Sequence, residues 1–166
     1  MTLRELNEEI RICRKCRLWQ GAKNAVPGEG PSCATIMLVG QNPGAEEDAT
    51  GRPFVGRSGK FLNKVLAQNG FDRKNFFITS VVKHATPNNR KPLQDEIEAC
   101  LPYLTRQFKM TKPNIVLLMG AVAWMAPRIK GVKYIETVHP SAAMRFTKMR
   151  NRFLEDFAAL RKRLEC

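Results

Sequence analysis

The sequence predicts an α/β protein of three layers, α/β/α, in which helices cover both faces of a central four-stranded parallel sheet. Four short apolar runs alternate with segments of helical character, and this alternation is typical of a parallel sheet covered on both sides. The runs are continuous, which suits strands buried on both faces. The chain has 166 residues, of which 43% are hydrophobic, so we expect one domain with its own core over residues 1–166.

Each element is expected between punctuating glycine, proline or polar residues. The strands are expected at residues 34–40, 76–82, 114–120 and 133–139, the last being the weakest of the four. The helices are expected at residues 2–12, 58–69, 93–109, 120–128 and 146–164. Residues 17–33 are rich in glycine and proline and are expected to form a loop.

The charge balance indicates a polyanionic partner. The net charge is +13, from 28 Lys and Arg against 15 Asp and Glu, and basic side chains that neutralise phosphates release counterions. The alternative is a basic but unrelated enzyme. No segment approaches the ~18 apolar residues of a membrane span, and the polar start (MTLRELNEE) is not a secretory signal. We therefore expect a cytoplasmic monomer with no membrane partner.

The cysteines indicate metal or redox chemistry rather than disulfides. Their count is odd, which disfavours a disulfide framework in a cytoplasmic chain. Two of them form a C-x-x-C pair. The five are Cys13, Cys16, Cys33, Cys100 and Cys166.

Polar residues gather where the expected strands end, and ligands of such sheets bind beyond those ends. The first strand is followed by GQNPGAEED, the second ends in ITSVVKH, and the fourth ends in VHPSAAMR. Between the first two lies GRPFVGRSGKFL. The chain has only two histidines, and both stand in these strings.

Together with NNRKP and EIEAC, these strings resemble the family 4 uracil-DNA glycosylases, the iron–sulfur type, from about residue 13 to residue 145. GxxPG and HPS are weak motifs singly, but the combined run is highly specific. The resemblance implies the three-layer fold. It also implies hydrolysis of the bond between deoxyribose and a flipped-out uracil, which leaves an abasic site in DNA.

The resemblance assigns two catalytic residues. His139 would donate to the uracil carbonyl as negative charge develops there, and Asn42 would position the attacking water. Family 4 members usually have Glu-Ala or Glu-Gly in place of Gln41-Asn42, whereas this Asn is similar to that of the mismatch-specific and single-strand-selective branches. Plainer alternatives are a structural hydrogen bond for His139 and an Asn-Pro turn for Asn42.

The expected substrate-binding residues surround the base. Phe54 is expected to stack on it, with core packing as the alternative. Ser80 stands where family 4 enzymes usually have an Asn, whose amide hydrogen-bonds to the edge of uracil with both a donor and an acceptor. Serine has only one hydroxyl for this purpose. The missing hydrogen bonds to the uracil edge would then come from Gln41, Asn42 or a water, or else the enzyme prefers a different base. The full expected set is Gly40, Gln41, Phe54 and Ser80.

Three cysteines match the cluster ligands of family 4, and His84 stands where the fourth usually lies. A Cys3His set also suits structural zinc, so both metals remain open on the residues alone. The resemblance favours a [4Fe-4S] cluster in which His replaces one thiolate. The expected ligands are Cys13, Cys16, His84 and Cys100, while Cys33 and Cys166 are expected to be free thiols.

The DNA-binding residues are expected beside the base pocket. Ser58 is expected near a helix start, where backbone amides hold phosphates. The resemblance implies that the loop after His139 inserts a side chain into the gap left by the base, and Met144 suits that role, with burial in the core as the alternative. The expected set is Arg57, Ser58, Lys60, Ser141, Met144 and Arg145.

Two other functions stay open. The first is a glycosylase of changed specificity, for instance for hypoxanthine or xanthine. The second is a damaged-DNA-binding module of the same fold without turnover. A plain nucleotide-binding protein is disfavoured, because GxxxxGK[ST] and GxGxxG are both absent from the sequence.

Overall fold

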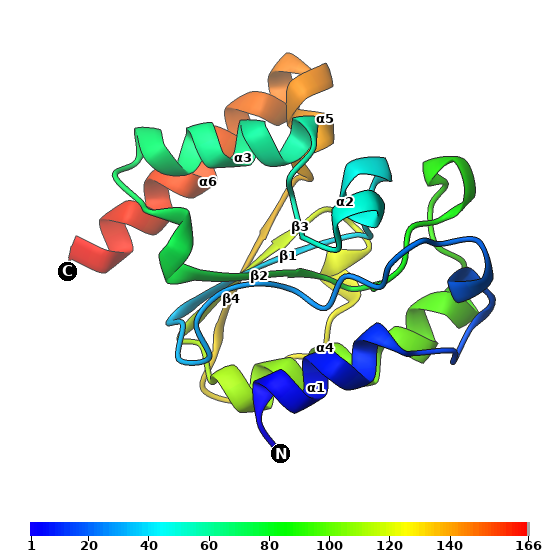
Figure 1. Ribbon diagram of the computed structural model, residues 1–166. Helices are drawn as coiled ribbons and strands as arrows, with labels where there is room; N and C mark the ends of the chain where they lie inside the picture. The colour runs from blue at the N-terminus through cyan, green and yellow to red at the C-terminus, as the bar shows by residue number, and fades with distance from the viewer. Residues whose placement is uncertain (166) are drawn as a thin grey trace.

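The computed structural model describes residues 1–165, with side chains to residue 164, and its centre is one parallel sheet (Figure 1). The strand order is β2-β1-β3-β4. The strands are β1 (Ile36–Gly40), β2 (Phe76–Ser80), β3 (Ile115–Met119) and β4 (Lys133–Thr137). The predicted fold class is confirmed.

Helices cover both faces of the sheet, as Figure 1 shows. On one face lie α1 (Leu3–Arg11) and α4 (Gln94–Thr111), which pack on each other. On the other lie α3 (Arg57–Gln68), α5 (Pro140–Arg145) and α6 (Thr147–Glu165). Successive side chains of a strand point to opposite faces, so Met37 packs in the first core and Leu38 in the second.

The register aligns the strand ends that carry the motifs. Gly40, the last residue of β1, pairs with Ser80, the last residue of β2. All five residues of β1 are buried, which explains their continuous apolar run. Strand β4 is an edge strand and its first four residues are at least partly exposed, which explains its weaker signal.

The helix expected at residues 120–128 is wrong. Only a 3₁₀ turn, η4 (Ala123–Met125), forms there. Ala126 precedes Pro127 and has extended backbone angles of φ −59° and ψ 146°, because proline disfavours helix at the residue before it. Trp124 Nε1 donates to the carbonyls of Leu118 and Thr137, which ties the short crossover to the sheet.

Two short helices were not expected: α2 (Ala45–Thr50) after β1, and α5 after β4. The segment expected as a loop contains the 3₁₀ helix η1 (Arg17–Gln20) and an antiparallel bridge between Glu29 and Ile78. No helix in the described part of the chain is long and apolar enough to cross a membrane. Cys166, expected as a free thiol, lies outside the described residues.

Candidate active site: a pocket at the strand ends

A cavity of about 160 Å³ lies beyond the carboxyl ends of the strands. Its lining includes five predicted residues that come from four different segments: Gln41, Asn42, Phe54, Ser80 and His139. Gly40, the remaining predicted substrate residue, does not line the cavity but lies directly behind it: a Cβ there would lie 2.4 Å from the Phe54 ring and 3.3 Å from Ser80 Oγ. The sheet therefore brings the predicted catalytic and substrate residues together.

His139 is held as a neutral hydrogen-bond donor. It is the N-cap of α5, and its Nδ1 accepts the Ser141 backbone N–H at 3.1 Å. An accepting Nδ1 leaves the ring proton on Nε2. Burial lowers the pKa of His139 to about 4, although the nearby Glu47 acts in the opposite direction. The imidazole is therefore uncharged at neutral pH.

A chain of amides orients Asn42. Gln41 Nε2 donates to Asn42 Oδ1 at 2.9 Å. Asn42 Nδ2 donates to the Pro43 carbonyl at 2.9 Å and to Asn89 Oδ1 at 3.4 Å. Asn89 also lines the cavity, and sequence reasoning did not single it out. Its only signal was its place in NNRKP.

Phe54 lies in the cavity wall with a strained backbone. Its φ is +48°, a left-handed conformation that bulky residues rarely adopt. The Phe54 and His139 ring centroids are 5.8 Å apart. At Gly59 a Cβ would lie 2.0 Å from the Phe54 carbonyl oxygen, so the turn needs glycine at that position.

Glu47 is a second residue that sequence reasoning missed, although it stands inside the GQNPGAEED string. It is 9% exposed and lines the cavity. Its carboxylate accepts the backbone N–H groups of Gly44 at 3.0 Å, Val55 at 2.8 Å and Gly56 at 2.6 Å. It therefore joins the loop after β1 to the loop before α3.

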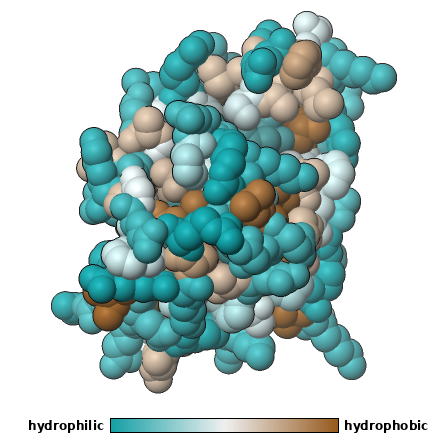
Figure 2. Space-filling view, turned by 90° about the vertical axis from the view of Figure 1, so that its right-hand side faces the viewer, coloured by the Kyte–Doolittle hydropathy of each residue, from teal (hydrophilic) through white to brown (hydrophobic). Residues whose placement is uncertain are grey.

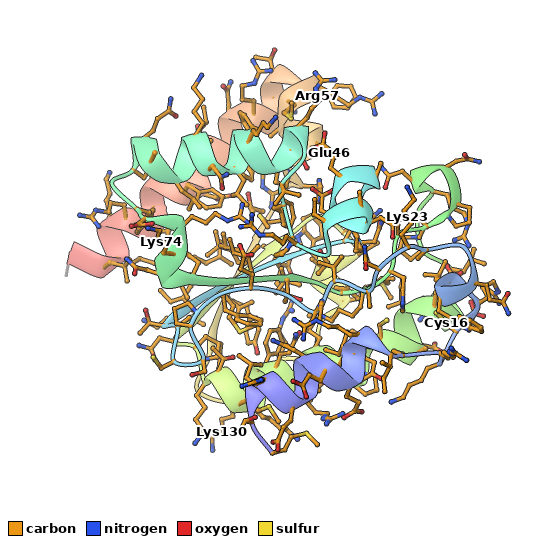
Figure 3. The ribbon with its side chains drawn as sticks, in the orientation of Figure 1. Cys16, Lys23, Glu46, Arg57, Lys74 and Lys130 are labelled. Carbon is orange, nitrogen blue, oxygen red and sulfur yellow. The ribbon has the colours of Figure 1, made fainter. Side chains whose placement is uncertain are left out.

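A second hollow of about 440 Å³ adjoins the first and shares Ser58 and Ser141 with it. Arg57, Met144 and Arg145 line it as well, so five of the six predicted DNA-binding residues surround one opening. Lys60 is exposed one turn further along α3. Figure 2 views this end of the molecule and shows a mostly hydrophilic surface with apolar residues near its centre. Figure 3 shows Arg57 at the start of α3 and Glu46 on α2, and both residues line the second hollow.

The predicted metal ligands lie at the same end of the protein. Cys13 and His84 line one cavity, and Figure 3 shows Cys16 between the end of α1 and the start of α4. Burial raises the pKa of the Cys100 thiol to about 11, and the thiols of Cys16 and Cys13 add to the increase. The four described cysteines are unpaired. Among residues 1–165, no three His, Cys, Asp or Glu side chains are arranged to hold a metal ion.

Comparisons with known proteins agree with this geometry. The model of the uracil DNA glycosylase superfamily matches residues 27–161. A type-4 uracil-DNA glycosylase of Sulfurisphaera tokodaii is 39% identical over 97% of this chain and 84% of its own length. Another, of Pyrobaculum aerophilum, is 41% identical over 95% of this chain and 92% of its own. A third type-4 uracil-DNA glycosylase, of Thermotoga maritima, is 35% identical over 91% of this chain and 88% of its own length.

Proposed function

Because the chain belongs to the uracil-DNA glycosylase superfamily, we propose that it is a DNA-repair enzyme that hydrolyses the N-glycosidic bond of uracil and leaves an abasic site. One observation carries the proposal. A neutral histidine, an oriented asparagine amide and an aromatic ring line the same small cavity at the strand ends. The enzyme acts on DNA as a monomer in the cytoplasm.

The pocket receives a base that has left the helical stack, because the glycosidic bond is inaccessible inside a duplex. Phe54 offers its ring to the base, and a base–aromatic contact contributes about 1–3 kcal/mol. Because Gly40 has no side chain, the Phe54 ring can pack directly against β1. The base thus stacks on Phe54 with its edge toward Ser80, which lines the same cavity.

His139 stabilises the departing base. Negative charge develops on a uracil carbonyl as the bond to the sugar breaks, and a pre-oriented donor stabilises that charge. Nε2 carries the proton, because Nδ1 is occupied by the Ser141 amide. No proton transfer is needed for this role, so the low pKa of His139 is no obstacle.

Asn42 and Asn89 hold the water that attacks the sugar carbon. Their side chains meet at 3.4 Å and both line the cavity. A neutral amide orients water but is a poor base. Orientation suffices when bond cleavage runs ahead of water attack and leaves an oxocarbenium-like sugar.

The DNA strand lies over the second hollow. Arg57, Lys60 and Arg145 neutralise its phosphates, and the first turn of α3 at Ser58 binds a phosphate through its backbone amides. Ser141 and Met144 approach the strand where the base has left it. Phe146 and Met149 extend this apolar edge, being 55% and 42% exposed.

We propose that Cys13, Cys16, His84 and Cys100 hold a [4Fe-4S] cluster. Each ligand of such a cluster binds a different iron, so the four side chains need not converge on one point as they do around tetrahedral zinc. The proposal is supported by the neighbourhood of the four donors: Cys13 and His84 line one cavity, and Cys16 and Cys13 lie close enough to Cys100 to raise the pKa of its thiol. The cluster would join α1, η1, α4 and the segment after β2.

Oligonucleotides that carry one uracil, hypoxanthine or xanthine test the activity. Purified, cluster-loaded protein should convert the uracil strand to an alkali-labile abasic product without added metal or cofactor. Strand cleavage by alkali after incubation is the measurement. Tight binding of every substrate with no cleavage would instead establish the non-catalytic module.

Ser80→Asn is expected to raise selectivity for uracil. An amide donates to a uracil carbonyl and accepts from the ring N–H at once, and a base that cannot match both leaves buried groups unsatisfied. A hydroxyl rotates between the two roles and discriminates less. The measurement is the ratio of kcat/KM on uracil to that on hypoxanthine, with Ser80→Ala as the control. An unchanged ratio would show that Gln41 and Asn42, rather than residue 80, recognise the edge of the base.

A further inference from the structure

We propose that Arg73 is a positioning residue that holds Phe54 in its strained conformation and so sets the platform for the flipped base. The inference rests on the proposed function, in which the Phe54 ring contacts that base. Arg73 belongs to the 3₁₀ helix η2 (Arg73–Asn75), which precedes β2. It is not among the residues that line the cavity, so any effect on catalysis must pass through another residue.

The guanidinium of Arg73 binds the two backbone carbonyls that flank the Cα of Phe54. Its Nη1 donates to the Phe54 carbonyl at 2.6 Å, and its Nη2 donates to the Pro53 carbonyl at 2.5 Å. Nη1 also donates to Asn63 Oδ1 at 2.9 Å, on α3. The planar fork of arginine makes two such bonds in fixed geometry, which lysine does not. Two consecutive carbonyls are thus oriented by one side chain that is only 18% exposed.

A buried carboxylate holds the next two residues from the other direction. Glu47 Oε2 accepts the N–H groups of Val55 and Gly56. In residues 53–56, the first two carbonyls therefore bind the guanidinium of Arg73, and the last two amides bind the carboxylate of Glu47. Phe54, with its left-handed φ, lies between these two sets of hydrogen bonds. Such backbone strain persists only where the surrounding structure holds the residue in place.

Glu29 supports Arg73 from the edge of the sheet. Its carboxylate lies 3.4 Å from Arg73 Nη2 and 2.7 Å from Arg52 Nε. Its backbone exchanges two hydrogen bonds with Ile78 of β2, at 2.9 and 2.8 Å. Gly28 and Gly30 permit this contact, because a Cβ at either would lie within 3.0 Å of a β2 carbonyl oxygen.

This arrangement predicts what happens when Arg73 is lost. Without the two carbonyl bonds, Phe54 relaxes toward the negative φ that L-residues prefer, and its ring leaves the face it presents beside His139. Arg52 is the matched control residue. It shares the Glu29 partner but bonds to neither the Pro53 nor the Phe54 carbonyl through its side chain.

The test is a double-mutant cycle measured by single-turnover excision of uracil. Arg73→Lys should lower the rate by about tenfold or more, as small misplacements at an active site do, while Arg52→Lys stays within about twofold. In a Phe54→Ala background, Arg73→Lys should have less than about a twofold further effect, since coupled residues are not additive. Equal losses in both backgrounds would overturn the proposal.

A second readout separates this proposal from the proposed function. With 4-fluorophenylalanine at position 54, the ¹⁹F resonance should shift or broaden in Arg73→Lys and stay unchanged in Arg52→Lys, at temperatures where both variants are folded. An unmoved resonance in Arg73→Lys would overturn the positioning role. A parent protein that leaves uracil intact would overturn the proposed function alone, because the fluorine spectrum still reports on Phe54.

Discussion

Replacing His139 by alanine is expected to lower the single-turnover rate of uracil excision by about 10²–10³-fold, the loss typical when one pre-oriented donor to a developing anion is removed. DNA binding should change little, because the His139 ring faces the cavity rather than the phosphates. The measurement is the excision rate at saturating enzyme, beside the affinity for a uracil-containing oligonucleotide. A rate within tenfold of the parent would show that another group stabilises the leaving base.

The protonation of His139 also predicts how the excision rate depends on pH. Burial lowers the pKa of His139 to about 4 from its ordinary value near 6.5, so the neutral donor persists throughout the range in which a free histidine would titrate. We expect no inflection near pH 6.5 in the single-turnover rate. An inflection there that disappears in His139→Gln would show that the ring is charged when it acts.

His139 should make the protein less stable as the pH falls, whereas a histidine paired with a carboxylate makes a protein more stable as the pH falls. As the pH falls below about 6.5, the unfolded chain protonates this residue while the folded chain does not, because the folded-state pKa is the lower one. The contribution is therefore present above pH 6.5 and is lost between 6.5 and about 4. The denaturant midpoint of the parent should therefore fall relative to that of His139→Gln over that interval.

The fold could be predicted because its signal is local. The strands IMLVG and IVLLM are buried along their whole lengths, so their sequences carry the pattern of a central strand. The turn at residues 123–125 shows where local patterns fail. AVAWMAPR reads as helical, but the position of Pro127 and the two carbonyls bound by Trp124 favour a tight crossover.

The candidate site was predictable where motif residues sit at strand ends, and not where partners come from afar. His139 and Asn42 stand directly beyond strands that the sequence reveals. The role of Arg73 depends on a backbone carbonyl 19 positions earlier, and that of Asn89 on an amide 47 positions earlier. Neither pairing has a local pattern, so the structure was needed to find them.

Replacing Cys100 by alanine is expected to remove nearly all the iron from the protein. Cys100 is 3% exposed and lies in α4 among apolar side chains, where no alternative donor is available from solvent. The backbone of Lys83, the residue before His84, acts to lower the pKa of the Cys100 thiol against the effect of burial, so the segment that carries His84 passes close to Cys100. Cys33→Ala is the matched control, since Cys33 is exposed and unpaired.

The parent should contain about four iron and four acid-labile sulfide ions per chain after anaerobic preparation. Cys33→Ala should match it, and His84→Cys should retain the cluster at least as well, because a thiolate restores the four-sulfur ligand set. Zinc without sulfide in the parent would instead assign a Cys3His zinc site. Full iron content in Cys100→Ala would exclude Cys100 as a ligand. Because the same segments carry Asn89 and the amide chain to Asn42, loss of the cluster should lower the melting temperature and the excision rate together, whereas His139→Ala should lower the rate alone.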